Sequence, residues 1–238
     1  MQKRMIELVS RTAAWLVGAV VLTQLCSTVS AATVPFTEDF GTGSSNWRDS
    51  TGTVPLVWNT TGGPDGGAFA ATTFNFAQSA ANDTPVLFRG QSGFGSSGGA
   101  FVGDWVAGGV NGFDLYVRQN SGVPLNFFAR FAGPANFPGA AKIFMIPVPS
   151  DTWTQLNTVL PDPSLVFEGP FTYPQVFSNI GNVQIGVSVP SGLAGLDQGF
   201  QFALDKVSIV PEPATLALLL SGGAVALTRR FRHKDRQI

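Results

Sequence analysis

The sequence predicts an all-β protein: one β-sandwich domain between two terminal address segments. Glycine and proline recur roughly every 8 to 12 residues between 32 and 210, and the short stretches between them are rich in Phe, Val, Thr and Trp. Phe113, Leu115 and Val117 alternate with polar neighbours, which predicts a strand with one buried face. Helical periodicity in this region never exceeds a turn or two, so we expect no helical layer.

The expected elements follow from these short stretches. We expect strands at 34–40, 56–58, 67–76, 86–89, 100–103, 112–118, 125–131, 141–147, 152–158, 183–189 and 200–209. The segment 60–67 contains Pro-Asp-Gly and several glycines, which predicts a tight turn. The proline-rich segment 161–174 also carries apolar residues that need a surface, so we expect a loop packed across an edge of the sandwich.

The N-terminus has the pattern of a secretory signal peptide. A basic start precedes an apolar segment at 13–25, and small residues lead up to Ala31, after which we expect cleavage. Cys26 raises the alternative of a lipoprotein, but Leu25 occupies a position where a lipoprotein signal needs a small residue. We therefore assign 1–31 to an ordinary signal peptide.

The C-terminal segment 211–238 has three parts: Pro211-Glu212-Pro213, an uncharged apolar run at 214–228, and a basic end. As a helix the apolar run would rise about 22 Å, short of the ~30 Å hydrocarbon core, although it could still span a thinned bilayer. The basic end predicts a cytoplasmic C-terminus, which leaves everything before residue 211 outside. The alternative is a buried amphipathic helix, but the run is apolar on all sides.

This tail resembles the PEP-CTERM sorting signal of exported bacterial proteins. The resemblance follows the proline-glutamate-proline tripeptide, the short apolar run and the basic terminus. It implies an exosortase-type processing enzyme as a partner, with Pro211, Glu212 and Pro213 as the sorting motif. It also implies export to the cell envelope, membrane anchoring by the C-terminal helix before processing, and an association with exopolysaccharide and biofilm-type matrices.

The composition of residues 32–210 excludes several functions. The chain's single cysteine, Cys26, and single histidine, His233, both lie outside this region, which excludes catalysis by Ser-His-Asp or Cys-His groups and disfavours zinc. Twelve acidic residues face six basic ones, so a nucleic-acid partner is not expected. No pattern of a carboxylate-dependent glycosidase is found, although separate carboxylates leave that class open.

Three stretches resemble galactose-binding-like and laminin-G-like jelly-roll modules. They are Glu38-Asp39-Phe40 followed by Trp47, the segment 151–156 around Trp153, and the segment 202–209. The resemblance implies a β-sandwich of jelly-roll type whose first and last strands are neighbours, with both tryptophans in the core. It also implies a shared structural Ca²⁺ held by Glu38 and Asp205 with backbone carbonyls, although Lys206 stands where relatives commonly have a second Asp.

Aromatic residues are candidates for a sugar site, since flat apolar rings can cover the C–H faces of pyranoses. We single out Trp58, Trp105 and Tyr116 as ligand-binding residues. The predicted function is that of an exported, envelope-anchored, non-catalytic protein that binds or organises exopolysaccharide. The alternatives are a structural surface protein without a sugar site and a carbohydrate-active enzyme that uses two carboxylates.

Overall fold

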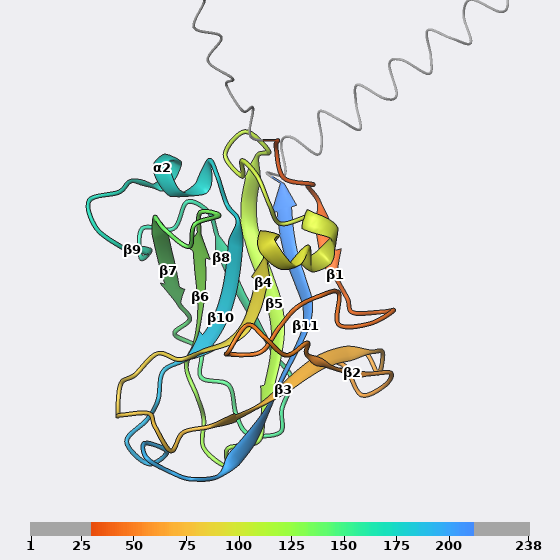
Figure 1. Cartoon of the computed structure of the whole chain (residues 1–238), viewed down its shortest axis with the longest axis vertical. Helices are drawn as coiled ribbons and strands as arrows, with labels where there is room; N and C mark the ends of the chain where they lie inside the picture. The colour runs from red at the N-terminus through yellow and green to blue at the C-terminus, as the bar shows by residue number, and fades with distance from the viewer. Residues whose placement is uncertain (1–29, 212–238) are drawn as a thin grey trace, which may run out of the picture.

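The computed structural model describes residues 30–211, which form two antiparallel β-sheets packed face to face (Figure 1). The larger sheet is built from β1 (Phe36–Glu38), β2 (Val57–Asn59), β3 (Phe69–Asn75), β5 (Val110–Gln119), β8 (Thr154–Val159) and β11 (Gly199–Pro211). The smaller sheet is built from β4 (Val86–Gln91), β6 (Phe127–Ala132), β7 (Gly139–Ile143), β9 (Val166–Phe167) and β10 (Asn182–Val187). The prediction of an all-β sandwich is confirmed.

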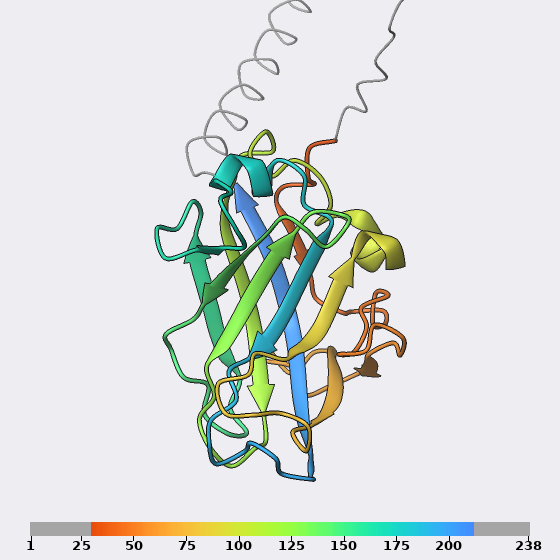
Figure 2. The same cartoon turned by 60° about the vertical axis from the view of Figure 1, so that its left-hand side comes forward.

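The strand order is β2-β3-β11-β5-β8 in the larger sheet and β4-β10-β6-β7-β9 in the smaller one, which lies in front in Figure 2. β11 is long enough to pair with two strands along one edge: β3 pairs along its first half and β1 along its second. β5 pairs along the opposite edge of β11. β11 is therefore the central strand on which the larger sheet is assembled.

The first and last strands are neighbours, as the jelly-roll resemblance implied. β1 and β11 are antiparallel, with Phe36 opposite Ile209 and Glu38 opposite Val207. Because Phe36 begins β1 and Ile209 stands near the end of β11, the two chain ends leave the sandwich at the same end (Figure 1).

One expected strand is wrong, and a short strand and a short helix were not expected. The stretch 100–103 is not a strand, because two 3-10 turns, η1 (Ser92–Phe94) and η2 (Ser96–Gly99), precede it and leave one isolated bridge, between Gly103 and Ile180. The loop at 161–174 packs against the sandwich edge as expected, yet it supplies the two-residue strand β9 beside β7. It then leads into the short helix α2 (Tyr173–Phe177).

The core lies between the sheets and is rich in aromatic side chains. Trp47, Trp105, Phe113 and Phe131 have no exposed surface. The expectation that Trp47 belongs to the core is confirmed. Trp153 is only half-buried, so its assignment to the core is wrong.

The address segments lie almost wholly outside the described residues. This holds for the signal peptide up to residue 29, for Glu212 and Pro213, and for the apolar run 214–228. Pro211 is the last residue of β11 and pairs with Val110, so the sorting motif begins inside the larger sheet. Among residues 30–211, no helix has the length and apolar character needed to cross a membrane.

Candidate functional site

The outer face of the larger sheet contains a hollow with a volume of about 290 Å³, which we call the β3 pocket. Pairing places Val57, Ala71, Ala203 and Arg118 directly opposite one another across β2, β3, β11 and β5. Directly opposite residues share a face of the sheet. The two alanines therefore form a low floor between larger side chains, and the hollow follows from this choice of residues.

Polar groups surround this apolar floor. They come from the ends of the strands and from the loops beside them: Asn59, Thr73, Asn120, Asp151 and Gln201. Within residues 30–211, the side chains of Thr73 and Gln201 make no hydrogen bond, and both residues are exposed. The Oδ1 atom of Asn120 accepts a hydrogen bond from the backbone N–H of Gln201 (2.7 Å). An apolar floor with a few polar groups at its rim is typical of ligand pockets.

Arg118 is held in the pocket wall by aromatic rings. Its guanidinium carbon lies 5.3 Å from the ring centre of Phe69 and 5.1 Å from that of Trp153. These two rings meet edge to face with centres 5.4 Å apart, and the Trp153 indole N–H donates a hydrogen bond to the carbonyl of Gly62 (2.8 Å). The rings therefore fix the arginine by cation–π contacts, which do not use its N–H donors.

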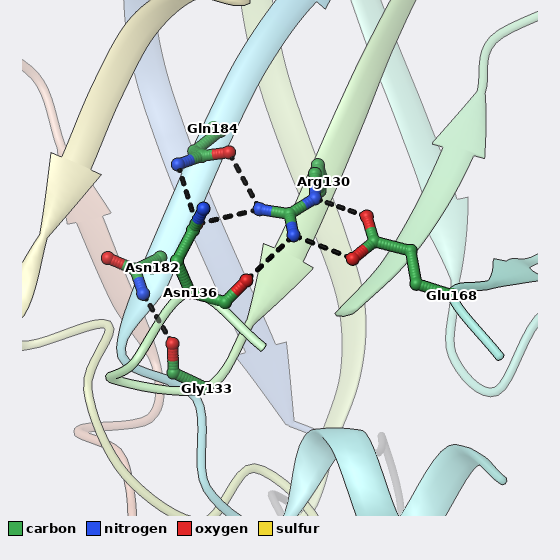
Figure 3. A network of polar contacts seen from close by, with 6 residues as sticks. All are labelled: Arg130, Gly133, Asn136, Glu168, Asn182 and Gln184. Atoms are coloured by element: carbon green, nitrogen blue, oxygen red, sulfur yellow. Dashed lines mark hydrogen bonds and ion pairs between the residues drawn. The ribbon is translucent and has the colours of Figure 1, made fainter. Parts of the chain in front are cut away.

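The outer face of the smaller sheet carries a polar network centred on Arg130 (Figure 3). Its guanidinium donates to both carboxylate oxygens of Glu168, to the side-chain and backbone oxygens of Asn136, and to the side-chain oxygen of Gln184 (2.9 Å). These five hydrogen bonds use all five donors of an arginine. The network therefore ties strands and loops together and leaves Arg130 nothing to offer a ligand.

The three predicted aromatic ligands are not brought together. Trp105 is fully buried beside Phe131 and Phe177, and its N–H donates to the carbonyl of Phe101 (2.8 Å), so the prediction that it binds a sugar is wrong. The sequence could not show this, because a tryptophan between Asp and glycines in a turn has no periodicity that reveals burial.

Trp58 and Tyr116 are accessible but do not line the β3 pocket. Trp58 is 41% exposed at the sheet edge, where it lies opposite the buried Ala70 and its N–H donates to the carbonyl of Phe40 (2.7 Å). Tyr116 is half-buried, and its hydroxyl donates to Gln155 (3.1 Å). Their register places them on opposite faces of the larger sheet, so they do not form one platform.

The predicted calcium ligands stand on neighbouring strands, as expected. Asp205 is buried, and its Oδ1 accepts a hydrogen bond from the backbone N–H of Lys206 (2.7 Å). Glu38 is also buried, and its Oε1 accepts one from the backbone N–H of Phe40 (2.9 Å). In residues 30–211, no three acidic, histidine or cysteine side chains gather into a metal-binding group. A cation here would need backbone carbonyls.

Such carbonyls are present beside Gly63. A methyl group on Gly63 would lie 2.9 Å from Asp205 Oδ2 and 3.0 Å from the carbonyl oxygens of Gly67 and Ala68. Three oxygens thus converge on one small space, and an all-oxygen set suits Ca²⁺. Burial, with Asp65 nearby, raises the pKa of Asp205 to about 6 although the Lys206 N–H opposes the shift. A cation would stabilise this carboxylate.

The chain also places a cation of its own beside this space. Lys206 has a positive φ of 48° in a bulge of β11, and its Nζ lies 2.7 Å from Asp65 Oδ2. The substitution noted in the sequence, lysine where relatives have aspartate, therefore puts an ammonium group next to the acidic side chains. The site therefore contains oxygen atoms that could bind a calcium ion and also a lysine ammonium group that would compete with the ion for them.

No family model matches the sequence, and no curated protein matches it. A family 11 carbohydrate-binding module from Clostridium thermocellum, in complex with a β-1,3-1,4-mixed-linked tetrasaccharide, is 11% identical with a TM-score of 0.43, over 76% of this chain and 98% of that one. A CBM22-1 xylan-binding domain from Paenibacillus barcinonensis is 15% identical with a TM-score of 0.44, over 76% and 98%.

A third similar structure, the CBM22-1–GH10 modules of a Clostridium thermocellum xylanase with xylohexaose, is 13% identical with a TM-score of 0.46. The likeness covers 77% of this chain, which spans 29% of that longer one. All three neighbours contain carbohydrate-binding modules. TM-scores this low carry no weight for function, which has to follow from the side chains of this chain.

Proposed function

We propose that this protein is a non-catalytic carbohydrate-binding protein and that the β3 pocket is its sugar site. The observation that carries the proposal is the group of unengaged donors and acceptors, Thr73, Gln201 and Arg118, around the alanine floor. A sugar presents many hydroxyl groups beside apolar C–H faces, so it matches a pocket of this kind.

We propose binding and not hydrolysis because of the acids in the pocket. Asp151 is the single carboxylate among the residues that line it. A glycosidase needs two carboxyl groups about 5 to 10 Å apart across the scissile bond. Glu168, a carboxylate outside the pocket, is held by Arg130 on the other sheet. A structural surface protein without a sugar site remains the competing hypothesis, and the test below separates the two.

The test is to fill the pocket. Ala71 lies on the outer face of β3, so Ala71→Leu adds bulk to the floor without entering the core between the sheets. On a glycan array followed by calorimetry, we expect the full chain to bind a glycan and Ala71→Leu to lose at least about tenfold in affinity. The matched control is Ala141→Leu on the outer face of β7, which should bind like the unaltered chain.

Two outcomes would overturn the sugar site. If no glycan binds, the structural alternative is favoured. If a glycan binds and Ala71→Leu and Ala141→Leu leave its affinity equally unchanged, the ligand uses another surface. Equal melting temperatures for both variants would show that the comparison is not affected by misfolding.

We propose further that the domain is displayed outside the cytoplasmic membrane, exported by residues 1–31 and held by the tail until an exosortase-type enzyme processes it. Support comes from the charge asymmetry around the apolar run 214–228 and from the tripeptide before it. A reporter enzyme fused at Val210 should be active only outside the membrane. Activity confined to the cytoplasm would contradict this location.

We also propose a structural Ca²⁺ bound by Asp205 and loop carbonyls, with Glu38 on the adjoining strand. The three oxygens that converge beside Gly63 support it. At about 100-fold excess over Kd, calcium should stabilise the fold by roughly 2.7 kcal/mol, and Asp205→Asn should remove that gain. Equal melting curves in millimolar calcium and in chelator would show that calcium does not bind here and that the Lys206 ammonium takes its place.

A further inference from the structure

One basic side chain differs from the others in the described residues. Arg118 makes no hydrogen bond and no ion pair within residues 30–211, whereas each of the other five basic side chains there has at least one oxygen partner. Those five are Arg48, Arg89, Arg130, Lys142 and Lys206. No buried side-chain nitrogen or oxygen in residues 30–211 lacks a partner, so the unpaired Arg118 nitrogens are open to solvent and accessible to a ligand.

The position of Arg118 is fixed although its donors are free. The Phe69 and Trp153 rings contact the guanidinium, and Trp153 is itself anchored to the carbonyl of Gly62. A side chain that is already ordered loses little rotamer entropy on binding. Its planar fork matches a carboxylate with two parallel hydrogen bonds, a geometry that an ammonium group does not offer.

Asp151 lines the same pocket, and its backbone N–H donates to the carbonyl of Gln119 (2.6 Å), the residue after Arg118. No ion pair joins it to Arg118, so more than 4.0 Å separates their charged atoms. Its Oδ2 accepts a hydrogen bond from the Ser150 hydroxyl (3.0 Å), which leaves Oδ1 for a hydroxyl group of a ligand. The pocket therefore contains one cationic and one anionic group, and both can orient a ligand.

We propose, on the basis of the proposed sugar site, that the β3 pocket selects an acidic sugar, a hexuronate, whose carboxylate pairs with Arg118. The hydroxyl groups of the same ring then face Asp151, Gln201 and Thr73. A singly charged carboxylate suits this site better than a phosphate, because Arg118 supplies one positive charge and Asp151 repels a second negative one. The polymer recognised is thus a uronic-acid-containing exopolysaccharide.

The experiment compares one oligosaccharide in two forms: a glucuronic-acid-containing oligomer, and the same oligomer with its carboxyl groups reduced to alcohols. By calorimetry with the full chain, we expect the acidic form to bind at least about tenfold more tightly. Arg118→Gln should abolish this difference, so that the acidic and the reduced form bind this variant with equal affinity. Arg89→Gln, which removes the same charge from the other sheet, should preserve the difference.

The outcomes separate this inference from the proposed sugar site. If both oligomers bind equally and Ala71→Leu weakens both, the pocket binds neutral sugar and the selection of uronate is wrong. If the acidic form binds more tightly but Arg89→Gln and Arg118→Gln lower its affinity by the same factor, the preference reflects the overall charge of the protein. The inference then also fails. If neither oligomer nor any other glycan binds, the proposed function itself fails.

Discussion

Two arginines on opposite faces of the sandwich show how neighbours decide the role of a residue. Arg130 gives all five donors to Glu168, Asn136 and Gln184, and therefore serves the fold (Figure 3). Within residues 30–211, Arg118 contacts two aromatic rings and has no oxygen partner, so its donors are free for the ligand that we propose. The residue type is the same, but the number of acceptors within reach differs.

At this scale we predict the effect of Asp151→Asn on ligand binding. Removing the negative charge from the pocket should raise the affinity for an acidic oligosaccharide a few-fold, because a repulsive charge pair disappears. The affinity for the carboxyl-reduced oligosaccharide should stay the same or fall, since an amide oxygen is a weaker acceptor than a carboxylate. Calorimetry on both ligands measures this, and an opposite change for the acidic ligand would contradict it.

Among the elements, the smaller sheet depends on contacts that cross its strands. Arg130 in β6 reaches Gln184 in β10, Asn136 in the loop that leads to β7, and Glu168 directly after β9. β9 has only two residues and pairs with β7 alone, so few backbone hydrogen bonds hold it. The arginine network therefore secures the weakest edge of the sheet.

We predict that Arg130→Met destabilises the fold without changing sugar binding. The substitution leaves Glu168 and Gln184 without their partner, and losing a partly buried charged group of this kind costs about 1–3 kcal/mol. Denaturant unfolding should report the loss. Glycan affinity, measured where the variant is still folded, should equal that of the unaltered chain, and a parallel loss of affinity would place the ligand on the smaller sheet instead.

For the molecule as a whole, the two sheets are joined at one edge by an ion pair. Lys142 in β7 of the smaller sheet donates to Asp162 (2.7 Å), which follows β8 of the larger sheet. Thr158 in β8 donates to the same carboxylate (2.7 Å). The hydrogen bond from Lys142 is the largest cause of a lowered pKa at Asp162, and that from Thr158 adds to it. Together they hold the pKa of Asp162 well below its usual range.

The lowered pKa predicts how acid affects stability. In the unfolded chain Asp162 takes up a proton at a higher pH than in the folded chain, so its contribution is present above about pH 4 and is lost as the pH falls further. Asp162→Ala should lower the free energy of unfolding by about 1.5–3 kcal/mol at pH 7, the value of a hydrogen bond to a charged group. The difference between the two proteins should shrink towards pH 2, and a constant difference would rule out this role.

The sequence alone predicted most of the strands, since alternation of apolar and polar residues marks a half-buried strand wherever it occurs. It placed Phe113, Leu115 and Val117 inside and Arg118 outside, which the burial of these residues confirms. It failed at 100–103, which follows two 3-10 turns rich in glycine and serine, and at Trp105, whose burial depends on partners far along the chain.

The β3 pocket was decided by the tertiary structure. Val57, Ala71, Arg118 and Ala203 look unremarkable in the sequence, and only strand pairing sets them in one row. Asp151 and Gln201 reach the same hollow from loops and strand ends distant in sequence. The alternation of apolar and polar residues within one strand determines which face of the sheet a residue occupies, because this pattern does not depend on the neighbouring strand. Which residues share a site depends on register between distant strands, and that is fixed only when the sheets form.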